Sequence, residues 1–156
     1  MKEYETTLLL CRKDTKVLLA CKKRGFGEGK WNGVGGKLNP GETPEQAMLR
    51  ETHEEIMITP TEYDQVGIME FDEYVKDEMA HLKFHLYVAT AWEGEPTETE
   101  EMNPKWFEID EVPYDEMFPD DRYWLPRILA GEKLHGFFVF DEKWNLLSQR
   151  FEEFEG

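Results

Sequence analysis

The stretch from Gly36 to Ile58 reads GKLNPGETPEQAMLRETHEEIMI, and it carries the strongest chemical signal in the chain. Within it, Glu51, Glu54 and Glu55 are spaced i, i+3 and i+4, which places them on one face of a helix. Three like charges on one face repel one another unless a cation neutralises them. Carboxylates are the ligands that Mg²⁺ prefers, and protein-bound Mg²⁺ commonly contacts phosphate groups as well. The spacing therefore indicates a metal-dependent enzyme that acts on a phosphorylated small molecule.

Local signals predict where this helix begins and what surrounds it. Thr43 suits the N-cap, Pro44 suits the first helical position, and Gln46 completes a capping box with Thr43. The residues that face away from the carboxylates and can pack against a core are Met48, Leu49, Thr52 and Ile56. A glycine-rich loop, in which the backbone can approach a ligand closely, precedes the helix at Gly33, Gly35, Gly36 and Gly41.

The same stretch resembles the signature of the Nudix hydrolases, and every charged position of that signature is present. The matching positions are Gly36, Glu42, Arg50, Glu51, Thr52, Glu54, Glu55, Met57 and Ile58. Thr52 replaces an apolar residue, and Met57 replaces the glycine that follows the helix. Because that glycine would cap the helix in the left-handed conformation, we expect the helix exit to follow another path here.

The resemblance extends beyond the signature to one branch of the family, the MutT homologues that hydrolyse oxidised purine nucleoside triphosphates. The similar segments are KKRGFGEGKWNGVGGK at 22–37, EEMNPKWF at 100–107, MFPDDRYWLP at 117–126 and KLHGFF at 133–138. The resemblance implies hydrolysis of 8-oxo-dGTP and similar nucleotides to a nucleoside monophosphate and pyrophosphate, which would sanitise the nucleotide pool.

The segment around Phe118 supplies the residue types that recognition of a purine base needs. Asn32 offers a donor and an acceptor, and Asp120 and Asp121 offer two adjacent carboxyls. In an apolar pocket the two cannot both ionise easily, so one would donate and the other accept a hydrogen bond. We expect a switch in their protonation to let the pair read either 8-oxoguanine or 2-hydroxyadenine. The alternative for one of the aspartates is a helix N-cap.

The walls of the base pocket are expected from the same resemblance. Phe118 would stack on the base where vertebrate relatives carry Trp, and Phe26 and Leu82 would form further walls. The alternative for Phe118 is an aromatic residue of the core, the commoner position for Phe. We also expect Thr7, Lys22, Gly36 and Lys37 to contact the substrate.

The metal site and the catalytic groups are likewise implied by resemblance. The Gly35 carbonyl with Glu51, Glu54, Glu55 and Glu101 would hold Mg²⁺, with Mn²⁺ as a substitute, and the ion would activate a water molecule. One of these glutamates would serve as general base. Arg50 would orient the glutamates by pairing with Glu42 or Glu54.

The composition restricts the partners. The chain has 156 residues and a net charge of −16, which disfavours polymeric nucleic acid and anionic membranes. A nucleotide would instead meet a local basic patch, Lys22, Lys23 and Arg24 with Lys30 nearby. No signal peptide or membrane span is evident, and Cys11 and Cys21 suit free thiols. We expect one domain over residues 1–156, cytoplasmic and monomeric.

The remaining patterning predicts an α+β fold, a Nudix-type α/β/α sandwich with a mixed β-sheet. A second helix is expected over 123–130, with Pro126 near its first turn and Gly131 closing it. Strands are expected over 6–11, 17–21, 65–74, 82–91, 106–109, 134–140 and 144–147.

Three alternatives stay open. The first is a Nudix enzyme acting on ordinary nucleoside triphosphates or on another diphosphate compound, with the same metal site and a different pocket. The second is a non-catalytic Nudix domain that binds a ligand, whose mark would be loss of the signature glutamates. The third is an acidic interaction protein, which the net charge alone permits.

Overall fold

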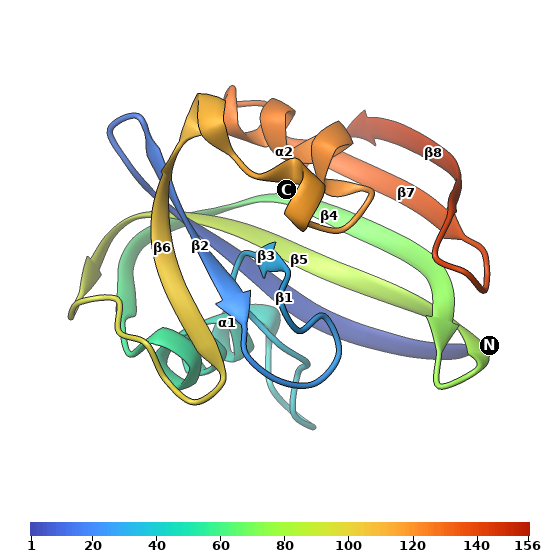
Figure 1. The fold of residues 1–156 in the computed structure, drawn as a ribbon, viewed down its shortest axis with the longest axis horizontal. Coiled ribbons are helices and arrows are strands. Elements are labelled where there is room, and N and C mark those ends of the chain that lie inside the picture. Colours follow the sequence, from blue (N-terminus) through green and yellow to red (C-terminus); the bar gives the residue numbers. More distant parts are fainter.

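A single mixed sheet of eight strands lies between two helices in the computed structural model, which describes residues 1–156 (Figure 1). The strands are β1 (Lys2–Lys13), β2 (Lys16–Lys22), β3 (Trp31–Asn32), β4 (Thr59–Val75), β5 (Glu78–Glu93), β6 (Met102–Glu108), β7 (Leu134–Phe140) and β8 (Leu146–Glu153). The helices are α1 (Pro44–Ile56) and α2 (Asp121–Leu129), with short 3₁₀ turns at Ile109–Glu111 and Tyr114–Glu116. The predicted α+β class with a mixed sheet is confirmed.

The sheet is ordered β3-β2-β1-β5-β4-β7-β8, with β6 paired to β2. The β1–β5 and β4–β7 pairs are parallel, and the remaining pairs are antiparallel. β4 and β5 form the long central hairpin, whose tight turn falls at Lys76 and Asp77 with φ of 51° and 65°. α1 contacts β1, β4 and β6, and α2 contacts β7.

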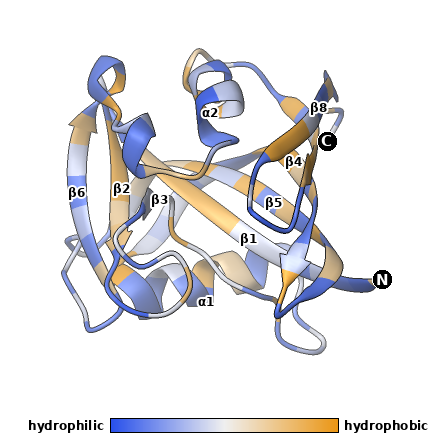
Figure 2. Ribbon diagram, turned by 45° about the vertical axis from the view of Figure 1, so that its right-hand side comes forward, coloured by the Kyte–Doolittle hydropathy of each residue, from blue (hydrophilic) through white to orange (hydrophobic).

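Both faces of the sheet are buried, because side chains alternate between the two sides of each strand. On β1, Leu8 and Leu10 join a cluster of 18 buried residues, and Leu9 and Cys11 join a separate cluster of 11. α1 covers the smaller cluster and α2 covers the larger one. Figure 2 shows the hydrophobic positions concentrated on the strands between the two helices.

α1 begins as the sequence predicts and ends differently. The Gln46 amide donates to Thr43 Oγ1 at 3.1 Å, and the Thr43 amide donates to Gln46 Oε1 at 3.0 Å, so the capping box is complete. The expectation of a different helix exit is wrong: Met57 itself adopts the left-handed conformation, with φ 64° and ψ 31°. Its side chain is 52% exposed, so solvent accommodates the side chain while the backbone bears the strain.

Several predicted boundaries are too short. β1, β4, β5 and β8 all extend through polar residues, because pairing with a neighbouring strand continues past the apolar stretch. α2 begins at Asp121, so Pro126 lies in its second turn rather than its first. Trp144 lies in a turn ahead of β8, with φ 63°, and not in a strand.

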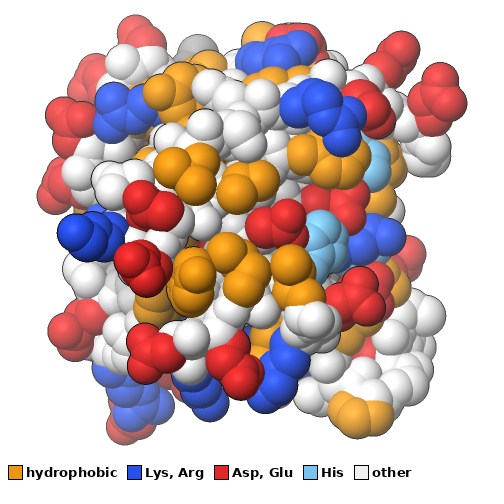
Figure 3. Space-filling view, turned by 90° about the vertical axis from the view of Figure 1, so that its right-hand side faces the viewer, with side chains coloured by type: hydrophobic (Ala, Val, Ile, Leu, Met, Phe, Trp, Pro, Cys, Tyr) orange, Lys and Arg blue, Asp and Glu red, His pale blue; other side chains and the backbone are white.

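The surface mixes charges of both signs. On the face shown in Figure 3, acidic side chains are spread across the molecule with basic ones among them, and histidines lie beside acidic groups. Both cysteines are free thiols, as predicted. Neither helix is of a length and apolarity that could cross a membrane.

Candidate active site

The glycine-rich loop lies directly on the central strand β1. The Thr7 amide donates to the Gly36 carbonyl at 2.9 Å, and Leu9 and Val34 exchange two backbone hydrogen bonds of 2.6 and 3.0 Å. A Cβ atom on Gly35 would stand 1.9 Å from the Thr7 carbonyl oxygen. Only glycine therefore permits this approach of the loop to the strand.

The acidic face of α1 is turned toward the same loop. A Cβ atom on Gly36 would lie 2.4 Å from the Glu51 carboxyl carbon, so the side chain of Glu51 closely covers that glycine. Glu55 is 4% exposed, and its Oε1 accepts a hydrogen bond of 2.8 Å from the Gly35 amide. Burial, with the charges of Glu51 and Glu101 added, raises the pKa of Glu55 to about 8.

Arg50 binds the glutamates of the signature together. Its guanidinium donates to both oxygens of Glu42, at 2.7 and 2.9 Å, and to Glu51 at 2.8 Å. A longer contact of 3.3 Å reaches Glu54, and Nη2 donates to the Lys37 carbonyl at 3.1 Å. The predicted pairing of Arg50 with Glu42 or Glu54 is thus realised with both, and Glu51 is an additional partner.

The groups around Gly35 suit a divalent cation. The Gly35 carbonyl accepts no hydrogen bond from the protein, although it stands beside the buried carboxyl of Glu55. No three carboxylates converge as metal ligands would, because Arg50 holds Glu51 and Glu54. The charge of Glu101 reaches Glu55 and disfavours its ionisation. An unpaired carbonyl amid mutually repelling carboxylates fits a hard cation, which would draw the carboxylates together.

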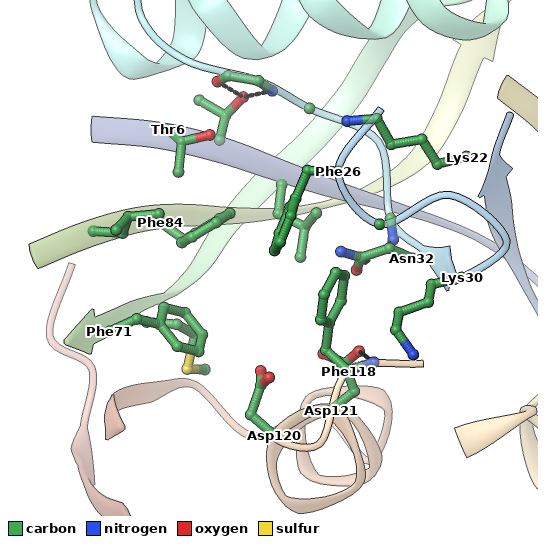
Figure 4. Close-up of a pocket in the computed structure, with 18 of the residues that line it drawn as sticks. Thr6, Lys22, Phe26, Lys30, Asn32, Phe71, Phe84, Phe118, Asp120 and Asp121 are labelled. Atoms are coloured by element: carbon green, nitrogen blue, oxygen red, sulfur yellow. Dashed lines mark hydrogen bonds between the residues drawn. The ribbon is translucent and has the colours of Figure 1, made fainter. Parts of the chain in front are cut away.

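A cavity of about 330 Å³ begins at this loop and extends between the sheet and α2 (Figure 4). Four of the predicted site residues, Arg50, Glu51, Glu54 and Glu101, do not line it. The other predicted residues all line it: Thr7, Lys22, Phe26, Asn32, Gly35, Gly36, Lys37, Glu55, Leu82, Phe118, Asp120 and Asp121. Residues from four separate parts of the sequence are therefore brought together around one space.

The aspartate pair stands at the α2 end of this cavity, opposite Phe71 and below Asn32 (Figure 4). Asp120 and Asp121 are 5% and 2% exposed. Trp124 Nε1 donates to Asp120 Oδ2 at 2.8 Å, and the Phe118 amide donates to Asp121 Oδ2 at 3.1 Å. Asp120 occupies the N-cap position of α2 but its side chain makes no capping hydrogen bond.

The two aspartates have unequal proton affinities. Burial raises the pKa of both, and the adjacent charge of Asp120 raises the pKa of Asp121 further. Asp121 consequently keeps its proton to a higher pH than Asp120. Asp121 is thus the carboxyl better suited to donate, and Asp120 the one better suited to accept. Nearby, Asn32 Oδ1 accepts from the Gly33 amide at 2.8 Å, which leaves the Asn32 NH₂ group free to donate.

Three aromatic rings that line the cavity pack together, and two of them are stacked. The rings of Phe26 and Phe118 are stacked with centroids 5.9 Å apart, and Trp144 lies 5.2 Å from Phe26 and 5.9 Å from Phe118. Lys30 Nζ lies 5.7 Å from the centroid of Phe118. The ring of Phe118 is therefore extended by Trp144, so the aromatic surface is larger than Phe118 alone provides.

The predicted basic patch divides into two parts. Lys22 and Lys30 line the cavity, and Lys37 joins them from the other side of the loop. Lys23 instead pairs with Glu98 at 2.6 Å, and Arg24 lies 3.8 Å from Glu100 and 3.6 Å from Glu101. The prediction that all four basic residues face the nucleotide is wrong for Lys23 and Arg24, because the acidic loop ahead of β6 occupies them.

Two lining residues that the sequence did not single out are Glu73 and Trp144. Glu73 follows Met69 and Phe71 at two-residue spacing on β4, so the strand pattern places it on the buried face. This periodicity is a local signal that could have identified Glu73, although buried glutamate is rare. Trp144 reaches the cavity from the β7–β8 turn through long-range packing, for which no local signal exists.

Comparison with known proteins agrees with this geometry. The family model of the NUDIX domain matches residues 1–128. An oxidized purine nucleoside triphosphate hydrolase of Danio rerio is 40% identical over 149 residues, covering 96% of this chain and 94% of its own. The protein of the same name from Mus musculus is 40% identical over 147 residues, covering 94% and 93%. The crystal structure of a mutator MutT protein from Bacillus halodurans superposes with a TM-score of 0.82 at 27% identity, covering 96% of this chain and 97% of that one.

Proposed function

The chain belongs to the Nudix family, and from that membership we propose that it hydrolyses oxidised purine nucleoside triphosphates, such as 8-oxo-dGTP, to the monophosphate and pyrophosphate. The relatives from Danio rerio and Mus musculus are named for this activity. The similarity covers 94% and 93% of their lengths. Removal of oxidised nucleotides from the nucleotide pool would be the cellular consequence.

One observation carries the proposal: a single cavity joins the acidic helix to the aspartate pair. Gly35, Gly36 and Glu55 line one end, and Asp120 and Asp121 line the other. A nucleoside triphosphate has the same two chemical ends, a phosphate chain that takes a metal and a base that presents donors and acceptors. The cavity therefore matches one molecule and not two separate ligands.

We assign the phosphate end to the groups around the glycine-rich loop. Lys22 supplies positive charge near Glu55, and Lys37 lines the same cavity, whereas Lys30 lies over Phe118 at the base end. Arg50 keeps Glu51 and Glu54 in place through its bonds to Glu42 and to the Lys37 carbonyl. The Gly35 carbonyl with Glu51, Glu54, Glu55 and Glu101 would hold the divalent ion on which Nudix hydrolases generally depend, Mg²⁺ or in its place Mn²⁺. When bound, that ion supplies charge neutralisation of the phosphates and a water molecule of lowered pKa.

We assign the base end to α2 and the aromatic stack. We assign the donor role to Asp121, whose pKa is raised further than that of Asp120, and the acceptor role to Asp120; with the Asn32 amide as a second donor they match a purine edge of mixed polarity. Phe118, extended by Trp144, offers an apolar surface for the base. Leu82 and Phe26 complete the apolar walls.

The proposal is tested by product analysis with 8-oxo-dGTP and Mg²⁺. The expected products are 8-oxo-dGMP and pyrophosphate, with loss of nearly all turnover in Glu54→Gln, which removes one charge without changing the side-chain size. Release of inorganic phosphate and a diphosphate would contradict the assigned cleavage position. Turnover that persists in Glu54→Gln and without a divalent ion would contradict the metal site.

A further inference from the structure

A third carboxyl, Glu73 of β4, faces the base end of the cavity. Along this part of β4 fully buried positions alternate with half-buried ones, so Met69, Phe71 and Glu73 share the face that lines the cavity. Glu70 and Asp72 point to the opposite face, where they pair with histidines. Glu73 thus follows two apolar residues on the cavity face of β4, and the charge of Asp120 acts on its carboxyl.

Glu73 is buried without a partner. Its side chain is 7% exposed, and no protein group donates a hydrogen bond to it or forms an ion pair with it. The other buried carboxyls of the cavity are each paired, Glu55 with the Gly35 amide, Asp120 with Trp124 and Asp121 with the Phe118 amide. Thr52 Oγ1 is the only side-chain polar atom sealed off without a partner, so the Glu73 carboxyl remains accessible from the cavity.

A buried, unpaired carboxyl is destabilising, so it calls for a partner that arrives with a ligand. The titratable group that acts on Glu73 is an acid, Asp120 of α2, while β5 places Ala80 beside Glu73. Burial, with the charge of Asp120 added, raises the pKa of Glu73 to about 8. Burial and the neighbouring charge thus favour the neutral form of the Glu73 carboxyl, which presents one O–H donor and one C=O acceptor side by side.

This donor–acceptor pair matches the part of a purine that oxidation at C8 changes. An 8-oxopurine presents N7–H and the C8 carbonyl next to each other, whereas an ordinary purine presents the N7 lone pair and C8–H. We propose that Glu73 reads this edge through two hydrogen bonds, accepting from N7–H and donating to O8, while α2 reads another edge of the same base. The proposal rests on the proposed function and deepens it, since it assigns the recognition of the oxidised position itself.

Because these acids come from two different elements, they can contact two different edges of the same base. Asp120 and Asp121 enter the cavity from α2, and Glu73 enters from β4. An ordinary purine would satisfy only the O–H of Glu73, through N7, and would leave its carbonyl unpaired. Two further consequences follow: 8-oxo-dATP should share the contact with 8-oxo-dGTP, and 2-hydroxy-dATP, which is unmodified at C8, should not.

The test compares Glu73→Met, which keeps the length and removes both polar atoms, with Glu73→Gln, which keeps a donor and an acceptor. Glu62→Met is the matched control, since Glu62 is an exposed acid on the same strand. In Glu73→Met, kcat/KM should fall at least about tenfold for 8-oxo-dGTP and 8-oxo-dATP, which lose two hydrogen bonds, and clearly less for 2-hydroxy-dATP, which loses only the bond to N7. Glu73→Gln should retain most of the preference, and Glu62→Met should change nothing.

An equal fall for all three nucleotides, or no fall for any, would overturn the proposal. Thermal unfolding of Glu73→Met shows whether the variant is folded. Its Tm should be higher than that of wild type, because Met replaces an unpaired buried acid. Binding of 8-oxo-dGMP and dGMP without metal separates this proposal from the proposed function. A tighter affinity for 8-oxo-dGMP that disappears in Glu73→Met supports the assignment even if turnover fails, and an affinity that Glu73→Met leaves unchanged overturns it.

Discussion

Arg50 and Glu42 form a two-point ion pair, with Arg50 Nε 2.7 Å from Glu42 Oε2 and Nη2 2.9 Å from Oε1. The pair ties α1 to the loop that precedes it, and the same guanidinium holds Glu51 at 2.8 Å. The hydrogen bond to Arg50 lowers the pKa of Glu42 to about 2. Arg50 therefore fixes the positions of carboxylates that we assign to the metal.

Arg50→Lys should impair metal use more than folding. Lysine cannot reproduce the planar two-point contact, so Glu51 and Glu54 lose their orientation. We expect kcat/KM to fall about 10- to 100-fold and the Mg²⁺ concentration for half-maximal activity to rise. Arg127→Lys is the matched control, because Arg127 forms a similar contact with Glu132 on the surface, with Nη2–Oε1 at 2.9 Å. An unchanged Mg²⁺ dependence in Arg50→Lys would contradict the positioning role.

Met57→Gly should stabilise the protein by about 1 kcal/mol. Met57 ends α1 in the left-handed conformation, which strains any residue with a Cβ atom. Glycine removes the strain, and part of the gain is offset by its greater freedom in the unfolded chain. Denaturant unfolding measures the difference, and Met57→Ala serves as control because alanine retains the Cβ. A glycine variant no more stable than the alanine variant would show that the strain is absent.

Trp144→Ala should weaken nucleotide binding and spare the chemical step. Trp144 packs against Phe26 and Phe118 at the mouth of the cavity, far along the chain from the signature glutamates. Loss of a stacking surface costs about 1–3 kcal/mol per base, so KM should rise about tenfold or more with kcat changed little. Steady-state kinetics on 8-oxo-dGTP test this, and Trp144→Phe should retain most of the affinity. A fall in kcat at constant KM would place Trp144 in a different role.

Stability should decline at alkaline pH through His81. Hydrogen bonds to Asp72, at 2.6 Å, and to Glu70, at 2.8 Å, raise the pKa of His81 against the opposing effect of burial. The folded pKa lies above the unfolded value, so the contribution is complete below the unfolded pKa and is lost as pH rises through the folded one. Burial alone would raise the pKa of Glu70, but the hydrogen bonds and charges of His81 and His135 lower it on balance. The stability that Glu70 contributes is therefore lost only as the pH falls into the acid range.

The measurement is denaturant unfolding of wild type and His81→Gln from about pH 6 to about pH 9. The difference in free energy of unfolding between the two proteins should shrink as pH rises. Comparison with the variant removes the contributions of the buried acids Glu55 and Glu73, whose raised pKa values act in the same direction. A difference that is constant over this range would show that His81 carries no charge in the folded protein.

The sequence predicted α1 and the glycine-rich loop well because their signals are local. Thr43, Pro44 and Gln46 lie within one turn, Gly35 is required by its contact with β1, and Gly36 is required by the side chain of Glu51. The path after Met57 was predicted wrongly, since an exposed side chain tolerates a strained backbone that propensity disfavours. The strand limits were predicted too short, because pairing partners and not composition decide where a strand ends.

The base end of the site could be predicted only in part. The aspartate pair and Phe118 are adjacent in the sequence and were recognised by resemblance. Trp144 comes from a distant turn, and only tertiary packing brings it to Phe118. Glu73 conforms to the two-residue periodicity of β4 but violates the tendency of glutamate to stay exposed, and such conflicts are most frequent at functional positions.

The most direct measurement of the central claim is the ratio of kcat/KM for 8-oxo-dGTP and dGTP, in wild type and in Asp121→Asn, with pyrophosphate release as the readout. We expect a strong preference for the oxidised nucleotide in wild type, and a marked loss of that preference in Asp121→Asn, which cannot exchange a proton with Asp120. Comparable turnover of both nucleotides by the wild-type protein would contradict the account. Such a result would leave the metal-dependent hydrolysis of the family in place but would rule out a preference for oxidised purines.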